Sequence, residues 1–336
     1  MKNLLYIGNR LARHGFNLTS IETLGPLLER EGFRVRYASA KKNKVFRMVE
    51  MLWKTIRYSR DTNYVLIDTY STYNFWYAVI ISQLCRILNL KYIPKLHGGE
   101  LPRRLQHDPW LCGMIFNHSY VNIAPSGYLH SAFKQAGFVN TIYIPNTIEL
   151  KNYTVKQRNR LSAKLLWVRS FSPIYNPEMA LHVLEKLKNE FRGAELCMVG
   201  PDKNGNLEKT RQLAIELGLD VTFTGKLSKE EWTKLSENYD IFINTTHFDN
   251  TPVSVIEAMA LGLPVVSTNV GGLPYLLTHR ETALLVDDND AEAMAESIRV
   301  LLKDNVLRET LVNNSLDLVR QFDSEKIIFK WFEILK

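Results

Sequence analysis

One segment of the chain, residues 246–277, combines side chains and a backbone pattern suited to a phosphorylated ligand. The segment begins after a short apolar run that is typical of a buried strand. Thr251 is predicted to cap a helix, and Pro252 suits the first helical position, where no N–H is needed. The free N–H groups of Val253 and Ser254 then lie at the helix N-terminus, where the helix dipole favours anions. We therefore predict a binding site for a diphosphate at this turn.

Two acids and a pair of glycines accompany this predicted helix. Ser254 and Glu257 are three residues apart and share one helical face, so a hydroxyl near phosphate and a carboxylate near a ribose diol suit the spacing. Asp249 precedes the helix and is expected to meet the sugar beyond the phosphates. Gly271 and Gly272 permit a close backbone turn, which we interpret as an approach to the ligand. Two acids at this spacing are common by themselves, so the flanking residues decide the interpretation.

The whole block resembles the donor-binding signature of the retaining GT-B glycosyltransferases of family four. In that family, two acids separated by seven residues precede EAMA, G-x-P-V-V and GG-x-P. The second acid binds the ribose of the nucleotide and the first approaches the transferred sugar, so the resemblance implies donor binding by Glu257 and a catalytic role for Asp249. The remaining matches are Ala258, Met259, Ala260, Gly262, Pro264, Val265, Val266, Gly271, Gly272 and Pro274.

Weaker similarities to the family follow in the expected order. Arg169 in LLWVRSF resembles the arginine that grips the donor diphosphate, for which a guanidinium offers a fixed fork of donors. The partner lysine is replaced by Asn176, so either Lys226 in TGKLS substitutes for it or the site has less positive charge. Gly200 and Leu227 resemble the family's contacts around the donor and its base.

The first half carries two further resemblances. His97 in KLHGGE resembles the histidine that the family offers to the sugar, and Gly15 lies where the family's glycine-rich loop faces the reaction centre. The resemblance implies retention of anomeric configuration by front-face attack, without a covalent nucleophile. The nucleotide-sugar, most often a UDP- or GDP-sugar, is a substrate, so no cofactor is implied. The sequence has no DxD run or His/Cys cluster, and we expect no metal; Arg169, the helix N-terminus and Lys226 are expected to stabilise the leaving group.

These residues require two α/β domains to position them. A chain of 336 residues exceeds the usual size of a single core, and β-rich runs alternate with helical patterns throughout. We predict two Rossmann-like doubly wound domains facing a cleft: 1–152 on the acceptor side and 163–323 on the donor side. A polar linker at 152–162 separates them, and a helix at about 324–336 packs back on the first domain. The predicted strands are Leu4–Gly8, Val35–Ala38, Tyr64–Asp68, Tyr92–Leu96, Val121–Ala124, Ile142–Ile144, Lys164–Val168, Glu195–Val199, Val221–Thr224, Ile241–Asn244, Pro264–Ser267 and Ala283–Val286.

Charge is unevenly distributed between the halves. Residues 1–150 hold 19 Lys and Arg against 9 Asp and Glu, whereas the rest of the chain is slightly acidic. Residues 40–60 are the densest basic segment, with Val45, Met48, Val49, Leu52, Trp53 and Ile56 at helical spacing. We predict either an ordinary surface helix whose apolar stripe packs on the sheet, or a segment held at an anionic membrane by its basic residues without insertion.

Location and function follow as expectations. The N-terminal apolar run is too short for a signal peptide, and Cys85, Cys112 and Cys197 form no CxxC pair, so we expect a cytoplasmic protein, peripheral on the inner face of the membrane. The expected acceptor is a saccharide or a lipid-linked glycan in cell-surface polysaccharide assembly. The alternatives are a nucleotide-sugar epimerase or phosphorylase of the same fold and, with no recognised motif in its favour, a basic nucleic-acid-binding protein.

Overall fold

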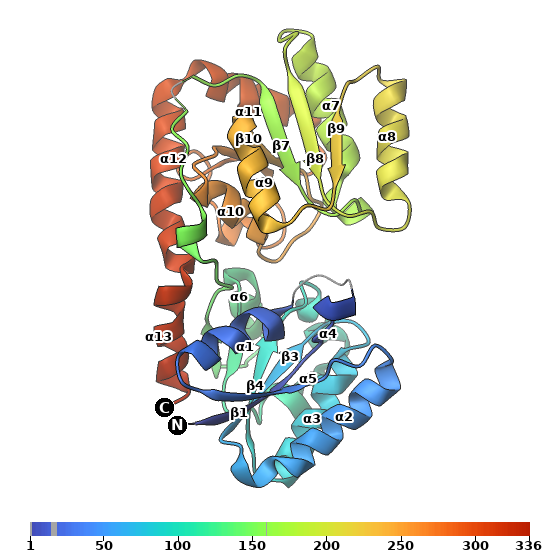
Figure 1. The fold of residues 1–336 in the computed structure, drawn as a ribbon, viewed down its shortest axis with the longest axis vertical. Helices are drawn as coiled ribbons and strands as arrows, with labels where there is room; N and C mark the ends of the chain where they lie inside the picture. Colours follow the sequence, from blue (N-terminus) through green and yellow to red (C-terminus); the bar gives the residue numbers. More distant parts are fainter. Residues whose placement is uncertain (1, 15–18, 159) are drawn as a thin grey trace. The chain divides into compact units, whose positions relative to one another are not determined.

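The computed structural model describes residues 2–14, 19–158 and 160–336, which form two compact units. The first unit comprises Met1–Asn146 and Ser324–Lys336, and the second comprises Thr147–Asp323. Each unit is built around one parallel six-stranded sheet (Figure 1).

The first unit has the strand order β2-β1-β3-β4-β5-β6. Helices α1 and α13 cover one face of the sheet, and α2 to α6 supply the apolar side chains of the other face. Because both faces are covered, β3 is buried at every position. The strands are β1 (Asn3–Ile7), β2 (Arg34–Ala38), β3 (Tyr64–Thr69), β4 (Lys91–Leu96), β5 (Asn122–Ala124) and β6 (Thr141–Tyr143). The helices are α1 (Ser20–Arg30), α2 (Lys44–Arg57), α3 (Phe75–Ile87), α4 (Leu101–His107), α5 (Pro109–Phe116), α6 (Gly127–Gln135) and α13 (Ser324–Ile334).

The second unit has the strand order β12-β11-β10-β7-β8-β9. Side chains of α7 and α11 fill the core on one face, and those of α9 and α10 fill the core on the other. The strands are β7 (Lys164–Val168), β8 (Glu195–Val199), β9 (Thr222–Gly225), β10 (Ile241–Asn244), β11 (Val265–Thr268) and β12 (Leu284–Val286). The helices are α7 (Pro177–Lys188), α8 (Asn206–Glu216), α9 (Lys229–Leu235), α10 (Val253–Ala260), α11 (Ala291–Lys303) and α12 (Asn305–Val319).

Short 3₁₀ turns complete both units. They are η1 (Ala12–His14), η2 (Ser59–Asp61), η3 (Leu150–Asn152), η4 (Pro173–Tyr175), η5 (Ser236–Asn238), η6 (Leu273–Tyr275) and η7 (Arg320–Phe322).

All twelve predicted strands form, and the predicted α/β class is confirmed. In each sheet the chain adds strands on one side and then returns to the other side of its first strand. The reversal lies between β1 and β3 in the first unit and between β7 and β10 in the second. Ligands of open α/β sheets bind at the carboxyl ends of the strands at such a switch point.

The boundary between the units lies after Asn146 rather than in the predicted linker. The described residues of 152–162 belong to the second unit, where Arg158 donates hydrogen bonds to the carbonyl oxygens of Ser236, Tyr239 and Leu261. A segment held by such contacts is part of the second unit and not a flexible linker.

The C-terminal helix α13 belongs to the first unit. There it lies beside α1, and Trp331 is buried in the core (Figure 1).

Candidate functional site

Two of the predicted catalytic residues meet at the switch point of the second unit. Arg169 follows β7, and Asp249 lies in the loop after β10, the strand that pairs with β7. Arg169 Nη2 lies 2.6 Å from Asp249 Oδ2, and the two side chains are 12% and 15% exposed. A short ion pair at this depth is shielded from water but can still be reached by a ligand.

The surroundings of Arg169 hold its guanidinium in place. Its Nε lies 3.4 Å from Asn244 Oδ1, and the guanidinium stacks 4.9 Å from the centre of the Tyr175 ring. Burial raises the pKa of Tyr175, with Arg169 acting in the opposite direction. The chain at the end of β8 passes close to the backbone of Arg169, and only glycine fits at position 200. A Cβ at Gly200 would lie 1.7 Å from the Arg169 carbonyl oxygen. The predicted donor contact Gly200 therefore has a packing role here.

Helix α10 begins one residue later than predicted. Pro252 rather than Thr251 is the N-cap residue, and the proline ring offers no acceptor to cap the helix. Thr251 lies one residue before the N-cap, and its hydroxyl donates to the carbonyl oxygen of Asn250. The first N–H groups of a helix have no intrahelical acceptor, so those of Val253 and Ser254 face outward without a capping side chain.

Ser254 adds a second anion-binding feature to this helix end. Its Oγ is shielded from solvent and has no hydrogen-bond partner among the residues described. A buried hydroxyl without a partner costs free energy, which a bound acceptor oxygen would recover. The N-terminus of α10 thus combines free N–H groups, the helix dipole and a hydroxyl donor.

Gly271 and Gly272 pack against the loop that carries Asp249, not against open space where a ligand could lie. A Cβ on Gly272 would lie 1.7 Å from the carbonyl oxygen of Asn250, and Gly272 N–H donates to the Asp249 carbonyl oxygen at 2.7 Å. A Cβ on Gly271 would lie 2.5 Å from the same Asp249 oxygen. The close backbone approach predicted at this pair is therefore made to the Asp249 loop, which it fixes, and a contact with a ligand stays a prediction.

Glu257 is buried on α10, and one oxygen of its carboxylate is already engaged. Tyr153 donates its hydroxyl to Oε1 at 2.7 Å, and Lys229 Nζ lies 2.9 Å from the same atom. Burial raises the pKa of Tyr153, and Glu257 raises it further, so the phenol remains a donor. Oε2 is left to accept another hydrogen bond.

The two donor-binding residues predicted after β9, Lys226 and Leu227, differ in their surroundings. Lys226 is exposed, and Leu227 packs against the core beneath α10. The lysine that reaches Glu257 is Lys229, three residues further on, which the sequence interpretation did not identify. Asn176, at the approximate position of the family's lysine, caps α7: its side chain accepts from Met179 N–H.

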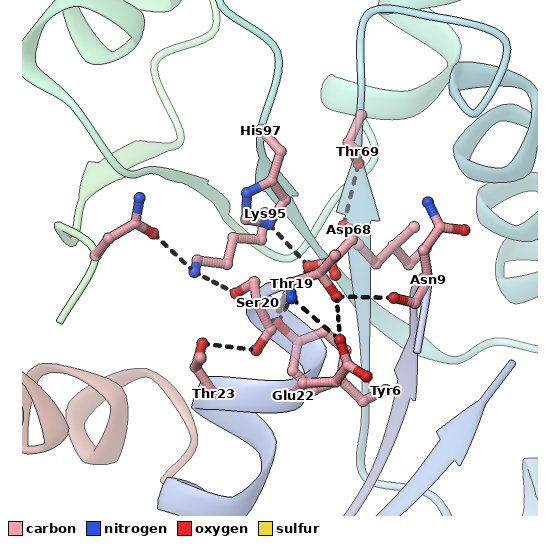
Figure 2. A network of polar contacts seen from close by, with 12 residues as sticks. Tyr6, Asn9, Thr19, Ser20, Glu22, Thr23, Asp68, Thr69, Lys95 and His97 are labelled. Atoms are coloured by element: carbon pink, nitrogen blue, oxygen red, sulfur yellow. Dashed lines mark hydrogen bonds and ion pairs between the residues drawn. The ribbon is translucent and has the colours of Figure 1, made fainter. Parts of the chain in front are cut away.

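In the first unit, His97 belongs to a buried polar network at the switch point between β1 and β3 (Figure 2). His97 Nε2 lies 2.8 Å from Asp68 Oδ1, and the Tyr6 hydroxyl donates to the same oxygen at 3.1 Å. Lys95 Nζ donates to Ser20 Oγ, which also lies 3.0 Å from the Tyr6 hydroxyl. Asp68 is fully buried, and its Oδ2 lacks a hydrogen-bond partner in the described part of the chain.

Electrostatics fix the protonation of this network. Burial lowers the pKa of His97, although the nearby Asp68 carboxylate opposes the shift. The ring is therefore neutral at pH 7 and donates its Nε2 proton to the carboxylate, which leaves Nδ1 as an acceptor. Burial also lowers the pKa of Lys95 to about 8, so it remains mostly protonated at pH 7. Nothing in the sequence around Lys95 or Asp68 distinguished them from strand residues.

Two predictions concern absent or undescribed features. Gly15 lies outside the described residues. In the ranges 2–14, 19–158 and 160–336, no group of three His, Cys, Asp or Glu side chains is arranged to hold a metal ion.

Comparison with known proteins identifies the second unit. Residues 154–317 match the model of the family described as glycosyl transferases group 1. D-inositol 3-phosphate glycosyltransferase of Corynebacterium efficiens is 29% identical over 48% of this chain and 40% of its own length. N-acetyl-alpha-D-glucosaminyl L-malate synthase of Bacillus anthracis is 25% identical over 72% and 66%. The capsular polysaccharide biosynthesis glycosyltransferase CapM of Staphylococcus aureus is 36% identical over 29% and 25%. The alignments thus span between a quarter and two thirds of these relatives.

Solved structures resemble the whole chain. Anabaena Alr3699/HepE, in complex with UDP and glucose, superposes with a TM-score of 0.78 at 18% identity, covering 100% of this chain and 99% of that one. Sucrose-phosphate synthase from Thermosynechococcus elongatus gives a TM-score of 0.81 at 17% identity, covering 99% and 98%. At this identity the likeness concerns the fold, and it confirms the predicted GT-B class with its two Rossmann-like sheets.

Proposed function

We propose that this protein, whose residues 154–317 match the family described as glycosyl transferases group 1, moves a sugar from a nucleotide-activated donor to an acceptor with retention of anomeric configuration. The observation that carries the proposal is the partly buried Arg169–Asp249 pair at the switch point, in the same loop system as the N-terminus of α10. This is where an open α/β sheet binds its ligand.

Each side chain has a proposed role in donor binding. Glu257 Oε2 accepts a ribose hydroxyl, and the Ser254 hydroxyl and the helix N-terminus bind the diphosphate. Arg169 meets the charge that develops on the leaving nucleoside diphosphate, and Asp249 orients Arg169 while approaching the transferred sugar. Lys229, whose Nζ lies 2.9 Å from Glu257 Oε1, supplies positive charge near the donor, the role that the sequence predicted for Lys226. His97 is proposed to accept a hydrogen bond from a sugar hydroxyl through Nδ1.

We propose that catalysis is independent of a metal ion. The guanidinium and the α10 N-terminus supply the positive potential that a cation otherwise provides at a diphosphate. EDTA should leave turnover unchanged, and inhibition that Mg²⁺ or Mn²⁺ reverses would contradict this part of the proposal.

The donor is proposed to be a UDP- or GDP-sugar, and the acceptor a saccharide or lipid-linked glycan in cell-surface polysaccharide assembly. The complex of HepE with UDP and glucose supports the donor class, and the likeness to CapM supports the process. We place the protein at the inner face of the cell membrane as a peripheral protein. Among the residues that the structure describes, no helix is long and apolar enough to cross a bilayer.

A donor screen tests the proposal. Purified protein is incubated with a panel of UDP-, GDP- and ADP-sugars, with and without glycan acceptors, and nucleotide release is measured. Release that depends on one donor and is accelerated by an acceptor is the expected result. Epimerised donor or phosphate-dependent release without an acceptor would favour the epimerase or phosphorylase alternative, and no turnover with any donor would refute the function.

A further inference from the structure

Helix α2 exposes an unusually apolar surface. Val45, Phe46, Val49, Trp53 and Ile56 are between 55% and 69% exposed. Four of them follow one another at steps of four, four and three residues, so they form a continuous stripe along the helix. Of the two alternatives predicted for this segment, an apolar stripe packed on the sheet or a segment held at an anionic membrane, the first does not hold for these side chains.

The opposite side of α2 already supplies the contacts with the core. Met51 is fully buried, and Met48 and Leu52 pack against the same core cluster. The exposed stripe is therefore additional to the packing that the fold requires. In Figure 1, α2 lies beside α3 along the border of the first unit.

Basic side chains border the exposed stripe. Lys41, Lys42, Lys44, Arg57 and Arg60 are exposed. Two other basic residues of this segment are engaged within the unit and do not contribute. Arg47 is buried and donates to the carbonyl oxygens of Lys41 and Lys42, and Lys54 pairs with Glu50 at 2.6 Å.

A groove connects the basic and apolar parts of this surface. Lys41 and Lys42 line it together with Phe46, Val49 and Trp53. Lys44 Nζ lies 5.2 Å from the ring centre of Tyr73, which is 80% exposed in the turn before α3. Aromatic side chains beside lysines are typical of proteins that sit at the boundary between lipid headgroups and acyl chains.

We propose that the exposed face of α2, with Tyr73, is a membrane-contact surface that binds anionic lipid bilayers. Phe46, Val49 and Trp53 enter the headgroup region, and the five exposed basic side chains contact lipid phosphates. This deepens the proposed function, on which it rests, by assigning residues to the membrane side of an enzyme with a lipid-linked acceptor.

Other occupants fit this face less well. A second copy of the chain would bring two sets of five positive charges together. A nucleic acid would satisfy the lysines and could stack bases on Phe46, Trp53 and Tyr73, but it would leave the aliphatic side chains of Val45, Val49 and Ile56 in water. A bilayer with anionic headgroups satisfies both the charges and the aliphatic stripe.

Sedimentation with vesicles tests the proposal, using the full chain. Vesicles of phosphatidylcholine alone are compared with anionic vesicles in which about 30% of the lipid, by mole, is phosphatidylglycerol. Binding should require the anionic lipid and weaken as NaCl rises, but a residual apolar component should persist at high salt. Trp53 fluorescence, read as the difference between the wild type and Trp53→Phe, should shift to the blue on binding.

Two variants separate the charge from the apolar contact. Changing Lys41, Lys42 and Lys44 to glutamate should weaken binding at least about 100-fold, since each basic residue near the surface contributes about fivefold. Phe46→Ser should weaken it about tenfold and abolish the residual binding at high salt.

Matched controls come from helices outside this face. Phe329 on α13 is 66% exposed, against 65% for Phe46, so Phe329→Ser removes the same side chain at equal exposure. The charge control replaces Lys209, Lys326 and Lys330, all exposed, with glutamate. Both controls should bind vesicles like the wild type.

Three outcomes would overturn the assignment. These are equal binding to neutral vesicles, equal losses in the variants and their controls, or concentration-dependent dimerisation that Phe46→Ser abolishes while vesicle binding is absent. UDP affinity, measured by calorimetry in the same variants, distinguishes a failure of the proposed membrane-contact surface from a failure of the proposed function. Intact UDP binding without vesicle binding refutes the surface alone, and vesicle binding without any nucleotide binding refutes the donor site alone.

Discussion

Glu257→Gln should separate donor binding from folding. Glu257 is 5% exposed, and Tyr153 and Lys229 both contact Oε1. Glutamine keeps a carbonyl oxygen for the Tyr153 hydroxyl, so the buried phenol stays satisfied. The lost ion pair contributes little, because Lys229 is 58% exposed and such pairs stabilise by under about 1 kcal/mol. The free energy of unfolding should therefore change by less than about 1 kcal/mol.

Binding of the donor should respond much more strongly to the same change. A hydrogen bond from a ribose hydroxyl to a carboxylate is worth about 1.5–3 kcal/mol more than none, so UDP should bind about 10- to 150-fold more weakly. The loss should vanish when the probe is UDP without its ribose hydroxyls, because both proteins then lack the contact.

Calorimetry with UDP and dideoxy-UDP, with a parallel urea titration, measures both effects. Glu257→Ala is the control that also removes the acceptor of the Tyr153 hydroxyl, and it should cost a further 1–3 kcal/mol or so of stability. Unchanged UDP affinity in folded Glu257→Gln would show that the carboxylate does not bind the nucleotide.

Three further predictions concern the remaining site residues. Arg169→Ala should lower kcat by about 10²–10³ with a smaller change in KM, measured with the donor found by the screen, and a fully active variant would place Arg169 outside the site. Gly272→Ala should destabilise the second unit by about 2 kcal/mol or more in a urea titration, because its Cβ would meet a carbonyl oxygen; Gly193→Ala, whose Cβ has no neighbour within 4 Å, is the control. Since burial lowers the pKa of His97, the unfolded chain takes up the proton first as the pH falls through about 6.5, so stability should decline there. Equal slopes for the wild type and His97→Gln would contradict that protonation state.

The strands could be predicted from the sequence because both sheets are parallel and covered on both faces. Such strands are continuous apolar runs, as in β3 and β10, where every residue is buried. The start of α10 was misplaced by one residue because Thr251 and Pro252 both suit a helix start. In the structure Pro252 is the N-cap residue and the helix begins at Val253.

Contacts between distant residues could not be predicted in the same way. Tyr153 is 104 residues from Glu257, and no periodicity relates the two. The partner of Gly271 and Gly272 within the fold could not be predicted for a similar reason. Their sequence shows that a close approach is possible, but only the fold shows that the approaching group is the Asp249 loop. Both cases concern which partner a suitable residue meets, which is decided by tertiary structure.

The exposed stripe of α2 shows where amphipathic patterns are ambiguous. Apolar residues at steps of three and four indicate a helix face, but they do not indicate whether the face meets the core or something outside the unit. Here Met51 and its neighbours occupy the core side, and Val49 and Trp53 remain exposed. A helix with two apolar sides satisfies the same pattern as a helix with one.

The two switch points place an acid in comparable positions but in different environments. Asp249 is 15% exposed and pairs with a guanidinium that a ligand can reach. Asp68 is fully buried, and the carboxylate bonds to Tyr6 and His97 rather than facing solvent. An acid that is sealed in this way cannot contact a substrate directly, but it can fix the tautomer of His97, which we propose as the substrate contact. The first unit is therefore suited to orient a hydrogen-bond acceptor, and the second to stabilise developing charge.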